Sequence, residues 1–280
     1  MYDYTDRHCF LVQRYGPHTF HTKKKELYDY MCRFEEWQPY RLTCGAIWDH
    51  TYTPTPFNFT TIDTFYSADE ARRLKEKLTQ SFAGRETATV VEVLAHPDPE
   101  IRGYAEFLFR NDYAPYTAKQ WGVSPSEIDP SVLQRVPLRF SYAEGYFDDP
   151  FQVMPVHSFT SFFQNLLNHP NIHVELGAEA LDRLAVRGSQ LLLDGEPLSV
   201  PVVYTGALDE LFGCAYGALP YRSLRFEWKY TEKESLQPAP VVAYPQEEGY
   251  TRITEYKKLP VQDKTGSSYA VEYPLPYREG

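Results

Sequence analysis

The sequence predicts a mixed α/β fold in which helices dominate the first part of the chain and short strands the last. Apolar residues recur at helical spacing in several stretches before residue 171, and alternating β-prone runs follow from residue 172. With 280 residues, the chain can bury a sizeable core or form two domains. No internal repeat or low-complexity linker separates the two parts.

Five helical segments are predicted, at 23–36, 67–84, 99–111, 124–135 and 157–168. Thr22 can cap the first of them. Ser67-Ala-Asp-Glu70 is a capping-box signature for the second, and Pro99 suits the first turn of the third.

The predicted strands are a bent pair within 42–59, short runs at 172–176, 190–193 and 200–204, and longer runs at 224–230, 241–244, 250–257 and 268–273. Glycines mark several of the turns, among them Gly188, Gly195, Gly249 and Gly266. After the turn at Gly206, Asp209 is expected to cap a short helix.

Composition excludes several classes of protein. A net charge of -10 and a pI near 5.3 argue against nucleic acid as a partner. No apolar run approaches the roughly 20 residues of a membrane span, and no secretory signal pattern is present. Four cysteines without a C-x-x-C pair are typical of reduced thiols, which favours the cytoplasm.

No metal site is expected. His18 and His21 have a spacing seen in some metal pairs, but no cluster elsewhere in the sequence completes a tetrahedral set. We interpret His21 as a packing or helix-start residue.

Two arginines lie among aromatic rings between Tyr116 and Phe147. This stretch contains YTAKQWG from Tyr116, RVPLR from Arg135 and GYFDD from Gly145. Flat rings stack on a base or sugar, and arginines bind diphosphate oxygens through paired, charge-assisted hydrogen bonds. The pattern indicates a nucleotide-sugar site, although core packing of the same rings is the plain alternative.

The chain resembles the UDP-galactopyranose mutase family. The stretch above is one matching block, and three more occur in the family's order: YGPHTFHT from Tyr15, VVYTGALDELF from Val202 with LPYRSLRFE from Leu219, and YTRITE from Tyr250. The resemblance covers nearly the whole sequence. It implies an FAD-binding α/β domain interleaved with a helical domain and an antiparallel sheet. The implied domains are 1–22 with 172–215, 23–41 with 60–171, and 42–59 with 216–280.

The family also implies which residues form the site. The matching substrate-binding positions are Tyr116, Trp121, Arg135, Tyr146, Phe147, Arg222 and Arg252. The matching FAD-binding positions are Gly16, Pro17, His18, Thr205, Gly206 and Arg252. For His18, a tight Gly-Pro turn with its ring bonded to backbone is an equal alternative. Arg139 and Arg225 have weaker claims, because either can pair with a neighbouring carboxylate.

Two positions depart from the family. Residues 111–115 read Asn-Asp-Tyr-Ala-Pro, where many members carry aromatic residues and a glycine. Ala243 stands where many relatives have a polar side chain. These departures concern the details of uracil recognition and of the sugar contacts, and they leave the expected diphosphate site unchanged.

The sequence contains no G-x-G-x-x-G, whereas the family holds the FAD pyrophosphate on such a turn. It resembles the family only from beyond that unit and stops before the closing segment. We interpret the chain as an internal portion of a flavoenzyme, with weak retention of FAD and weak or absent activity. Surface left open by missing strands would favour a homo-oligomer.

The chemistry implied by the family is isomerisation of UDP-galactopyranose to UDP-galactofuranose through an adduct between the sugar and N5 of reduced FAD. No protein nucleophile is needed, and the product serves cell-surface polysaccharide and cell wall biosynthesis. The alternative is a non-catalytic nucleotide-sugar-binding remnant that lacks FAD. A flavoprotein of the amine-oxidase type is a weaker third hypothesis, against which the YTAKQWG block argues.

Overall fold

The computed structural model describes residues 2–124, 127 and 136–277, and it confirms a mixed α/β fold with several sheets. Two compact units divide the chain. The first unit contains the chain up to Leu166 together with Arg222–Pro276. The second contains Leu167–Tyr221 and the residues from Tyr277 onward. The three-domain division expected from the resemblance stays a prediction.

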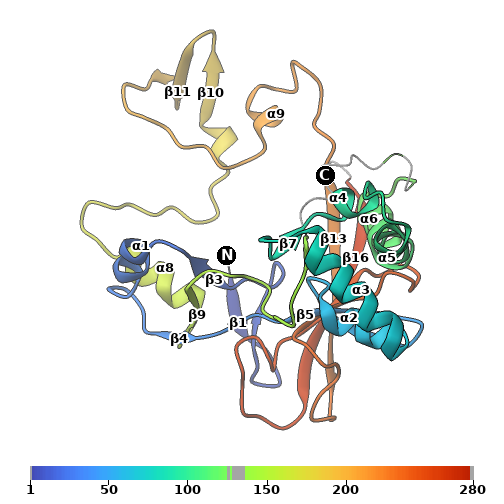
Figure 1. Ribbon diagram of the computed structural model, residues 1–280. Helices are drawn as coiled ribbons and strands as arrows, with labels where there is room; N and C mark the ends of the chain where they lie inside the picture. The colour runs from blue at the N-terminus through green and yellow to red at the C-terminus, as the bar shows by residue number, and fades with distance from the viewer. Residues whose placement is uncertain (1, 125–126, 128–135, 278–280) are drawn as a thin grey trace. The chain divides into compact units, whose positions relative to one another are not determined.

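A six-stranded sheet lies in the first unit, with the order β13-β16-β15-β14-β5-β6. In that order the strands span Arg222–Thr231, Ser267–Pro276, Arg252–Glu255, Val241–Ala243, Cys44–Trp48 and Thr51–Thr55. β13 and β16 are the longest and run side by side (Figure 1). All neighbours are antiparallel except β14 and β5, which are parallel. The predicted strand pair in 42–59 and the four longer runs are confirmed.

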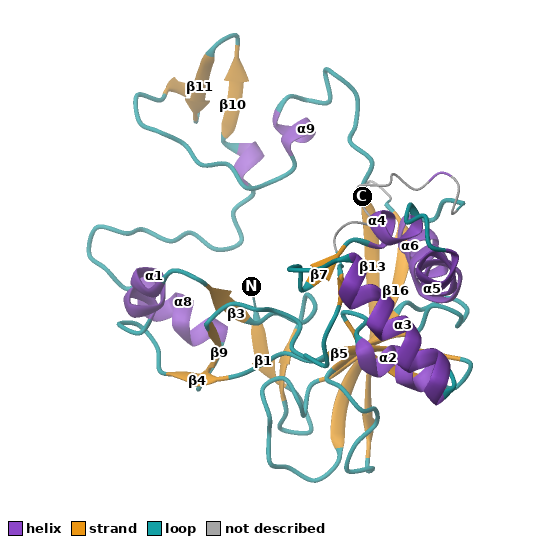
Figure 2. Ribbon diagram, viewed as in Figure 1, coloured by secondary structure: helices purple, strands orange, loops and turns teal. Residues whose placement is uncertain are grey.

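Helices gather beside this sheet (Figure 2). They are α2 (Phe59–Phe65), α3 (Ala68–Ser81), α4 (Val90–Leu94), α5 (Pro99–Leu108), the π-helical turn η1 (Phe109–Tyr113) and α6 (Ala114–Trp121). A short two-stranded sheet, β7 (Thr87–Ala88) with β8 (Leu138–Arg139), lies in the same unit. The helices enclose a core whose largest side chains include Trp48, Phe57, Ile62, Leu78, Ile101 and Leu108.

Local sequence determines where these helices begin. The backbone N–H and the hydroxyl of Ser67 both donate to the carboxylate of Glu70, at 3.1 and 2.5 Å. The carboxylate of Asp98 accepts from the N–H of Glu100 at 2.8 Å, and Pro99 occupies the start of α5. Both predicted helix starts are confirmed.

A second core lies around the first residues of the chain. It is covered by β1 (Asp3–Thr5), β2 (Leu11–Gln13), β3 (Phe20–Thr22), α1 (Lys25–Met31), β4 (Trp37–Pro39), β9 (Phe151–Pro155) and α8 (Phe159–Leu167). β3, β9 and β4 form one sheet. Phe10, Val12, Trp37, Phe159 and Tyr256 pack together beneath them. The helix predicted at 157–168 is confirmed as α8.

The helix predicted at 23–36 is shorter than expected, because α1 ends at Met31. Thr22 is not its N-cap residue. It ends β3, and its hydroxyl accepts from the N–H of Lys24 at 3.1 Å. After Met31 the N–H of Phe34 bonds the carbonyl three residues back, which tightens the last turn before β4.

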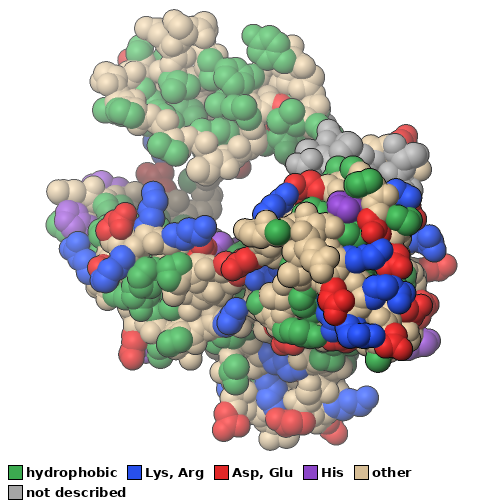
Figure 3. Space-filling view, viewed as in Figure 1, with side chains coloured by type: hydrophobic (Ala, Val, Ile, Leu, Met, Phe, Trp, Pro, Cys, Tyr) green, Lys and Arg blue, Asp and Glu red, His purple; other side chains and the backbone are tan. Residues whose placement is uncertain are grey.

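The second unit contains η3 (Ala180–Asp182), β10 (Leu184–Arg187), β11 (Gln190–Leu193), β12 (Glu196–Pro197) and α9 (Leu208–Leu211). The predicted strand at 190–193 is confirmed, but those at 172–176 and 200–204 are wrong. A strand needs a neighbour for its backbone groups, and these stretches have none among the described residues. Their apolar side chains stay in solvent, with Leu176 91% and Val203 89% exposed. Apolar surface is conspicuous on this unit in Figure 3.

Two sequence expectations need separate mention. Asp209 does not cap α9, because it lies inside the helix, where its carboxylate accepts from the N–H of Leu219 and the hydroxyl of Tyr221. The helix predicted at 124–135 lies largely outside the described residues. Within the described ranges, no helix is long and apolar enough to cross a membrane.

Asp3 connects the start of the chain to α8, and its removal should weaken the fold. Its carboxylate accepts from the N–H groups of Phe159 and Thr160 at 2.7 and 2.8 Å, as a helix N-cap does. Asp3→Ala should lower the free energy of unfolding by about 1–2 kcal/mol, measured by urea denaturation. Asp263→Ala, at an exposed loop position, is the control. Equal effects of both changes would contradict the capping role.

Candidate functional site

Helix α6 carries the YTAKQWG block, and Lys119 ties it to the sheet. The Lys119 ammonium donates to the carbonyl oxygens of Tyr244, Glu247 and Tyr250, at 2.7, 2.5 and 2.7 Å. These three residues belong to the connection between β14 and β15, so all three N–H donors are used on one loop. Burial lowers the pKa of Lys119 to about 8, against the opposing charge of Glu247.

Arg222, the first residue of β13, lies at the C-terminal end of α6. Its Nε donates to the carbonyl of Gln120 at 3.1 Å. Gly122 ends the helix in the left-handed conformation (φ 68°), and a Cβ there would lie 2.8–2.9 Å from the Arg222 guanidinium. A cation is favoured at this end of a helix. Among the described residues, Nη1 and Nη2 of Arg222 have no hydrogen-bond acceptor, so they are available to a ligand beside Trp121, which is 42% exposed.

Arg252 and Glu272 form a buried ion pair across β15 and β16. The Arg252 Nε lies 2.7 Å from Glu272 Oε2, and the two residues are directly opposite in the ladder. Burial opposes the charge of Arg252, but the carboxylate of Glu272 and the nearby Tyr116 keep its pKa above the ordinary value. The short distance from Nε to the Glu272 carboxylate commits this side of the guanidinium to the ion pair.

Tyr116 lies near this ion pair. Burial raises the pKa of its hydroxyl to about 12, while Arg252 lowers that pKa and Glu272, Asp112 and Tyr146 raise it. Tyr116 is therefore within electrostatic range of groups from η1, the sheet and the loop after β8. That Tyr116, Tyr146 and Arg252 form one ligand site stays a prediction.

The Gly16-Pro17-His18 loop also approaches Arg252. A Cβ at Gly16 (φ 97°) would lie 3.9 Å from Arg252 Nη2 and 3.8 Å from the Phe226 ring. The Nδ1 of His18 lies 2.8 Å from the Gly16 carbonyl, and the N–H of His18 donates to the Gln13 side chain at 2.5 Å. The tight turn with a backbone-bonded His18 is thus observed, and its contact with a flavin stays a prediction.

Phe147 and Tyr146 form an aromatic step next to β9. The Phe147 ring stacks on His21 at 3.5 Å and meets Tyr146 edge-on at 4.9 Å. His21 also approaches Asp149, with 2.5 Å between Nδ1 and Oδ2, so it is a packing residue as predicted. The weaker candidate Arg139 is buried and pairs with Asp148 at 2.7 and 2.9 Å.

The remaining candidates are described separately from this assembly. Arg225 pairs with Glu227 on the exposed face of β13. Thr205 and Gly206 are exposed and belong to the second compact unit. Arg135 lies outside the described residues. No group of three or more histidine, cysteine, aspartate or glutamate residues in the described ranges could hold a metal ion.

Three residues of the site were missed by sequence reasoning: Lys119, Glu272 and Asp112. Asp112 lies in η1 and is only 9% exposed. Burial raises the pKa of its carboxyl to about 7. The available signal in the sequence was that Asp112 lies four residues before Tyr116, which places both on the same face of a continuing helix.

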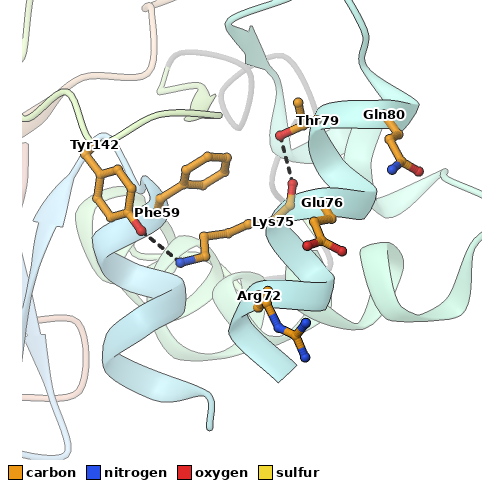
Figure 4. A pocket seen from close by; sticks show the side chains of 7 residues that line it. All are labelled: Phe59, Arg72, Lys75, Glu76, Thr79, Gln80 and Tyr142. Atoms are coloured by element: carbon orange, nitrogen blue, oxygen red, sulfur yellow. Dashed lines mark hydrogen bonds between the residues drawn. The ribbon is translucent and has the colours of Figure 1, made fainter. Parts of the chain in front are cut away.

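A surface hollow of about 400 Å³ lies elsewhere, between α2, α3 and Tyr142. Figure 4 shows Lys75 reaching from α3 toward Tyr142, with 2.8 Å between its Nζ and the hydroxyl. None of the residues that line it is a predicted site residue. We therefore build the site on α6 rather than on this hollow.

The fold is similar to that of a solved UDP-galactopyranose mutase. A crystal structure of reduced UDP-galactopyranose mutase superposes with a TM-score of 0.60 at 17% identity, covering 99% of this chain and 67% of that one. The family model for UDP-galactopyranose mutase matches residues 111–280.

Curated relatives agree with the family model. A dTDP-fucopyranose mutase from Escherichia coli is 34% identical over 94% of this chain and 68% of its own length. A UDP-galactopyranose mutase from Mycoplasma pneumoniae is 33% identical over 96% of this chain and 68% of its own length. The chain thus belongs to the UDP-galactopyranose mutase family, whose members are isomerases, and spans about two thirds of these relatives.

A glycine at position 122 should be needed to leave space for the Arg222 guanidinium. Gly122→Ala adds a methyl group 2.8–2.9 Å from the guanidinium and an unfavourable left-handed alanine. Gly84→Ala is the matched control, because Gly84 has a similar φ (80°) and nothing within 4 Å. Gly122→Ala should lower the free energy of unfolding by about 1–3 kcal/mol more than the control does, in urea denaturation. Equal losses would mean that Arg222 is not constrained by Gly122.

Asp112 should make stability depend on pH. A carboxyl whose folded pKa is raised stabilises the fold below its unfolded pKa of about 4, and this contribution is lost as pH rises toward the folded value, about 7. Asp112→Asn should remove this loss. Between pH 4 and 8, the variant should gain on the order of 3–4 kcal/mol relative to the wild type. Parallel pH profiles of unfolding free energy would show that Asp112 is not buried as described.

Proposed function

We propose that this protein is a nucleotide-sugar mutase that interconverts UDP-galactopyranose and UDP-galactofuranose with reduced FAD. The observation that carries the proposal is the arrangement of Arg222 over the C-terminus of α6, between the Gln120 carbonyl and Gly122. One nitrogen of the guanidinium donates to the Gln120 carbonyl, and the other two, which have no acceptor in the described ranges, can donate to diphosphate oxygens. Trp121 and Tyr116, on the same helix, supply rings for the nucleoside.

The ring contraction breaks the bond between the anomeric carbon and the diphosphate and later remakes it, with no net loss of atoms. The chain must therefore hold the UDP leaving group and stabilise its charge while it is detached. Arg222 and Arg135 are the residues we assign to this role, as charge-assisted donors to phosphate oxygens. Tyr146 and Phe147 would contact the ribose or phosphates.

Reduced FAD, when bound, supplies the nucleophile for the anomeric carbon. Arg252 and the Gly16-Pro17-His18 loop are the residues we assign to the flavin ring, because they lie close together: a Cβ at Gly16 would be 3.9 Å from Arg252 Nη2. Thr205 and Gly206, in the second compact unit, are the other FAD-binding candidates that match the family. For the pyrophosphate, the 280 residues offer no glycine-rich turn.

A second candidate function is a nucleotide-sugar-binding protein without flavin. The two candidates share the diphosphate site and differ only in the cofactor. In either case we propose a cytoplasmic location, because the exposed thiols of Cys9 and Cys32 suit a reducing compartment.

Arg222→Ala should weaken binding of UDP. Loss of paired charge-assisted bonds costs about 1.5–3 kcal/mol, which is roughly 10- to 100-fold in Kd. Arg225→Ala is the control, because Arg225 lies three residues along the same strand and pairs with Glu227. Isothermal titration with UDP measures both. If Arg222→Ala binds UDP as the wild type does, the diphosphate assignment is wrong.

The cofactor requires its own measurement. The purified chain is mixed with FAD and desalted, and its absorbance spectrum is recorded. A retained flavin band, followed by turnover of UDP-galactofuranose under reducing conditions, would support the mutase. UDP binding without retained flavin would support the binding protein.

A further inference from the structure

Lys119 lies within the candidate site, yet it has no donor left for a ligand. Its side chain is half-buried, and its ammonium donates to the carbonyl oxygens of Tyr244, Glu247 and Tyr250 at 2.7, 2.5 and 2.7 Å. A lysine ammonium has three N–H donors, so these carbonyls use all of them. Although Lys119 is two residues before Trp121, it does not act on a phosphate directly, and any effect on a ligand passes through the backbone of α6.

The contact between Lys119 and the loop requires a charged amine. Its three acceptors are neutral carbonyl oxygens, which accept hydrogen bonds and cannot donate them. An ammonium satisfies all three. A neutral amine has only two N–H groups, and it turns a lone pair toward the third oxygen. The arrangement around Lys119 is therefore specific for its protonated form.

The residues that follow Lys119 form the part of the site that we assign to the diphosphate. The Gln120 carbonyl accepts from Arg222 Nε at 3.1 Å, and Gly122 ends the helix beside the Arg222 guanidinium. Trp121, between them, is the exposed ring. The last turn of α6 is thus bonded both to the connection between β14 and β15 and to β13. Loss of the Lys119 contacts removes the first of these attachments and lets the Gln120 carbonyl shift relative to Arg222.

We propose that Lys119 is a positioning residue of the nucleotide-sugar site, and that its ammonium sets the affinity for UDP by fixing the last turn of α6 to the connection between β14 and β15. This inference rests on the proposed function and adds a residue that acts on the ligand only through others. Those others are the Gln120 carbonyl, which orients Arg222, and the ring of Trp121. A displacement of about 1 Å in a positioned group can cost on the order of 100-fold in rate, so a loss of affinity is expected when the helix shifts.

The charge of Lys119 can be removed without a mutation. Burial lowers the pKa of Lys119 to about 8, so the neutral amine prevails at pH 9. Because this pKa lies below the unfolded value of about 10.4, the folded state binds fewer protons, and deprotonation of Lys119 favours folding as the pH rises. The affinity for UDP should change in the opposite direction. A loss of affinity at pH 9 is therefore not explained by unfolding through Lys119.

The groups around Lys119 leave this pH range interpretable. Burial raises the pKa of Tyr116 on α6 and of Tyr244 on the loop to about 12, and it raises that of Tyr250 above its ordinary value. The Glu247 carboxylate favours the charge of Lys119.

Two further elements approach α6. Arg222 of β13 stays charged at these pH values, and Glu272 of β16 is paired with Arg252. Asp112 of η1, with a pKa of about 7, titrates close to the range. It is present in every variant below, so comparison between them removes its contribution.

The test is isothermal titration of UDP into the wild type, Lys119→Met and Lys258→Met at pH 7 and pH 9. Methionine keeps an unbranched side chain and removes the three donors. Lys258 is the matched control, because its ammonium also donates to a backbone carbonyl, that of Gln237, which is not part of α6. At pH 7, Lys119→Met should bind UDP about tenfold more weakly than the wild type, and Lys258→Met within about twofold of it.

At pH 9 the wild type has lost most of the Lys119 charge. Its affinity for UDP should be about fivefold lower than at pH 7, which leaves a difference of about twofold from Lys119→Met. Lys258→Met should follow the wild type at both pH values. Circular dichroism and urea denaturation at each pH confirm that the proteins are folded.

A second variant separates the position of the helix from the charge alone. Lys119→Arg keeps a positive charge, but a planar guanidinium fork cannot direct three donors from a single nitrogen toward three carbonyls. Lys119→Arg should therefore lose affinity as Lys119→Met does, and it should not regain it at either pH. If Lys119→Arg binds UDP as tightly as the wild type, the charge acts at long range and the positioning role is wrong.

The outcomes distinguish the two proposals. If the wild type fails to bind UDP, the proposed function falls and this inference falls with it. If the wild type binds UDP and Lys119→Met binds it equally well at pH 7, the diphosphate site stands and Lys119 does not position it. An unchanged wild-type Kd between pH 7 and 9 would also overturn the inference, even if the methionine variant did not fold.

Discussion

The site depends on how Lys119 is held. A single ammonium bonds three backbone carbonyls from the loop between β14 and β15, and thereby fixes α6 against the sheet. The other contacts of the site require α6 to be held in this position against the sheet. Arg222 reaches the end of α6 from β13, and Tyr116 on α6 is within electrostatic range of the Arg252–Glu272 ion pair. A helix free to slide along the sheet would lose both.

Much of the fold could be predicted from local sequence. The capping signals at Ser67 and Pro99 predict helices that the structure contains, because caps satisfy backbone groups within a few residues. The long β runs after residue 222 also form, since each finds a neighbour in one sheet. Residues 172–176 and 200–204 have the same alternation but no described partner, and alternation alone does not make a strand.

Sequence reasoning named candidate site residues only where a side chain matched a family block. Tyr116, Tyr146 and Arg252 were named in this way, and Tyr116 is within electrostatic range of the other two. Lys119 was overlooked because its partners are carbonyls about 125 residues away, which carry no side-chain signature. The sequence analysis noted Asp112 only as a departure from the family. Asp112 is notable because it is buried, and the sequence does not reveal burial.

The parallel pairing of β5 with β14 has a consequence for biosynthesis. Residues 44–55, which form β5 and β6, are synthesised well before residue 241, where β14 begins. At a synthesis rate of about 5–20 residues per second, β14 becomes available roughly 10–40 s after the β5–β6 hairpin. During this interval the Trp48 ring need not stay exposed to solvent. Its ring contacts Phe57, Phe65 and Phe107, which are all synthesised soon after it. The nascent helices can therefore shelter the hairpin from aggregation until the sheet is complete.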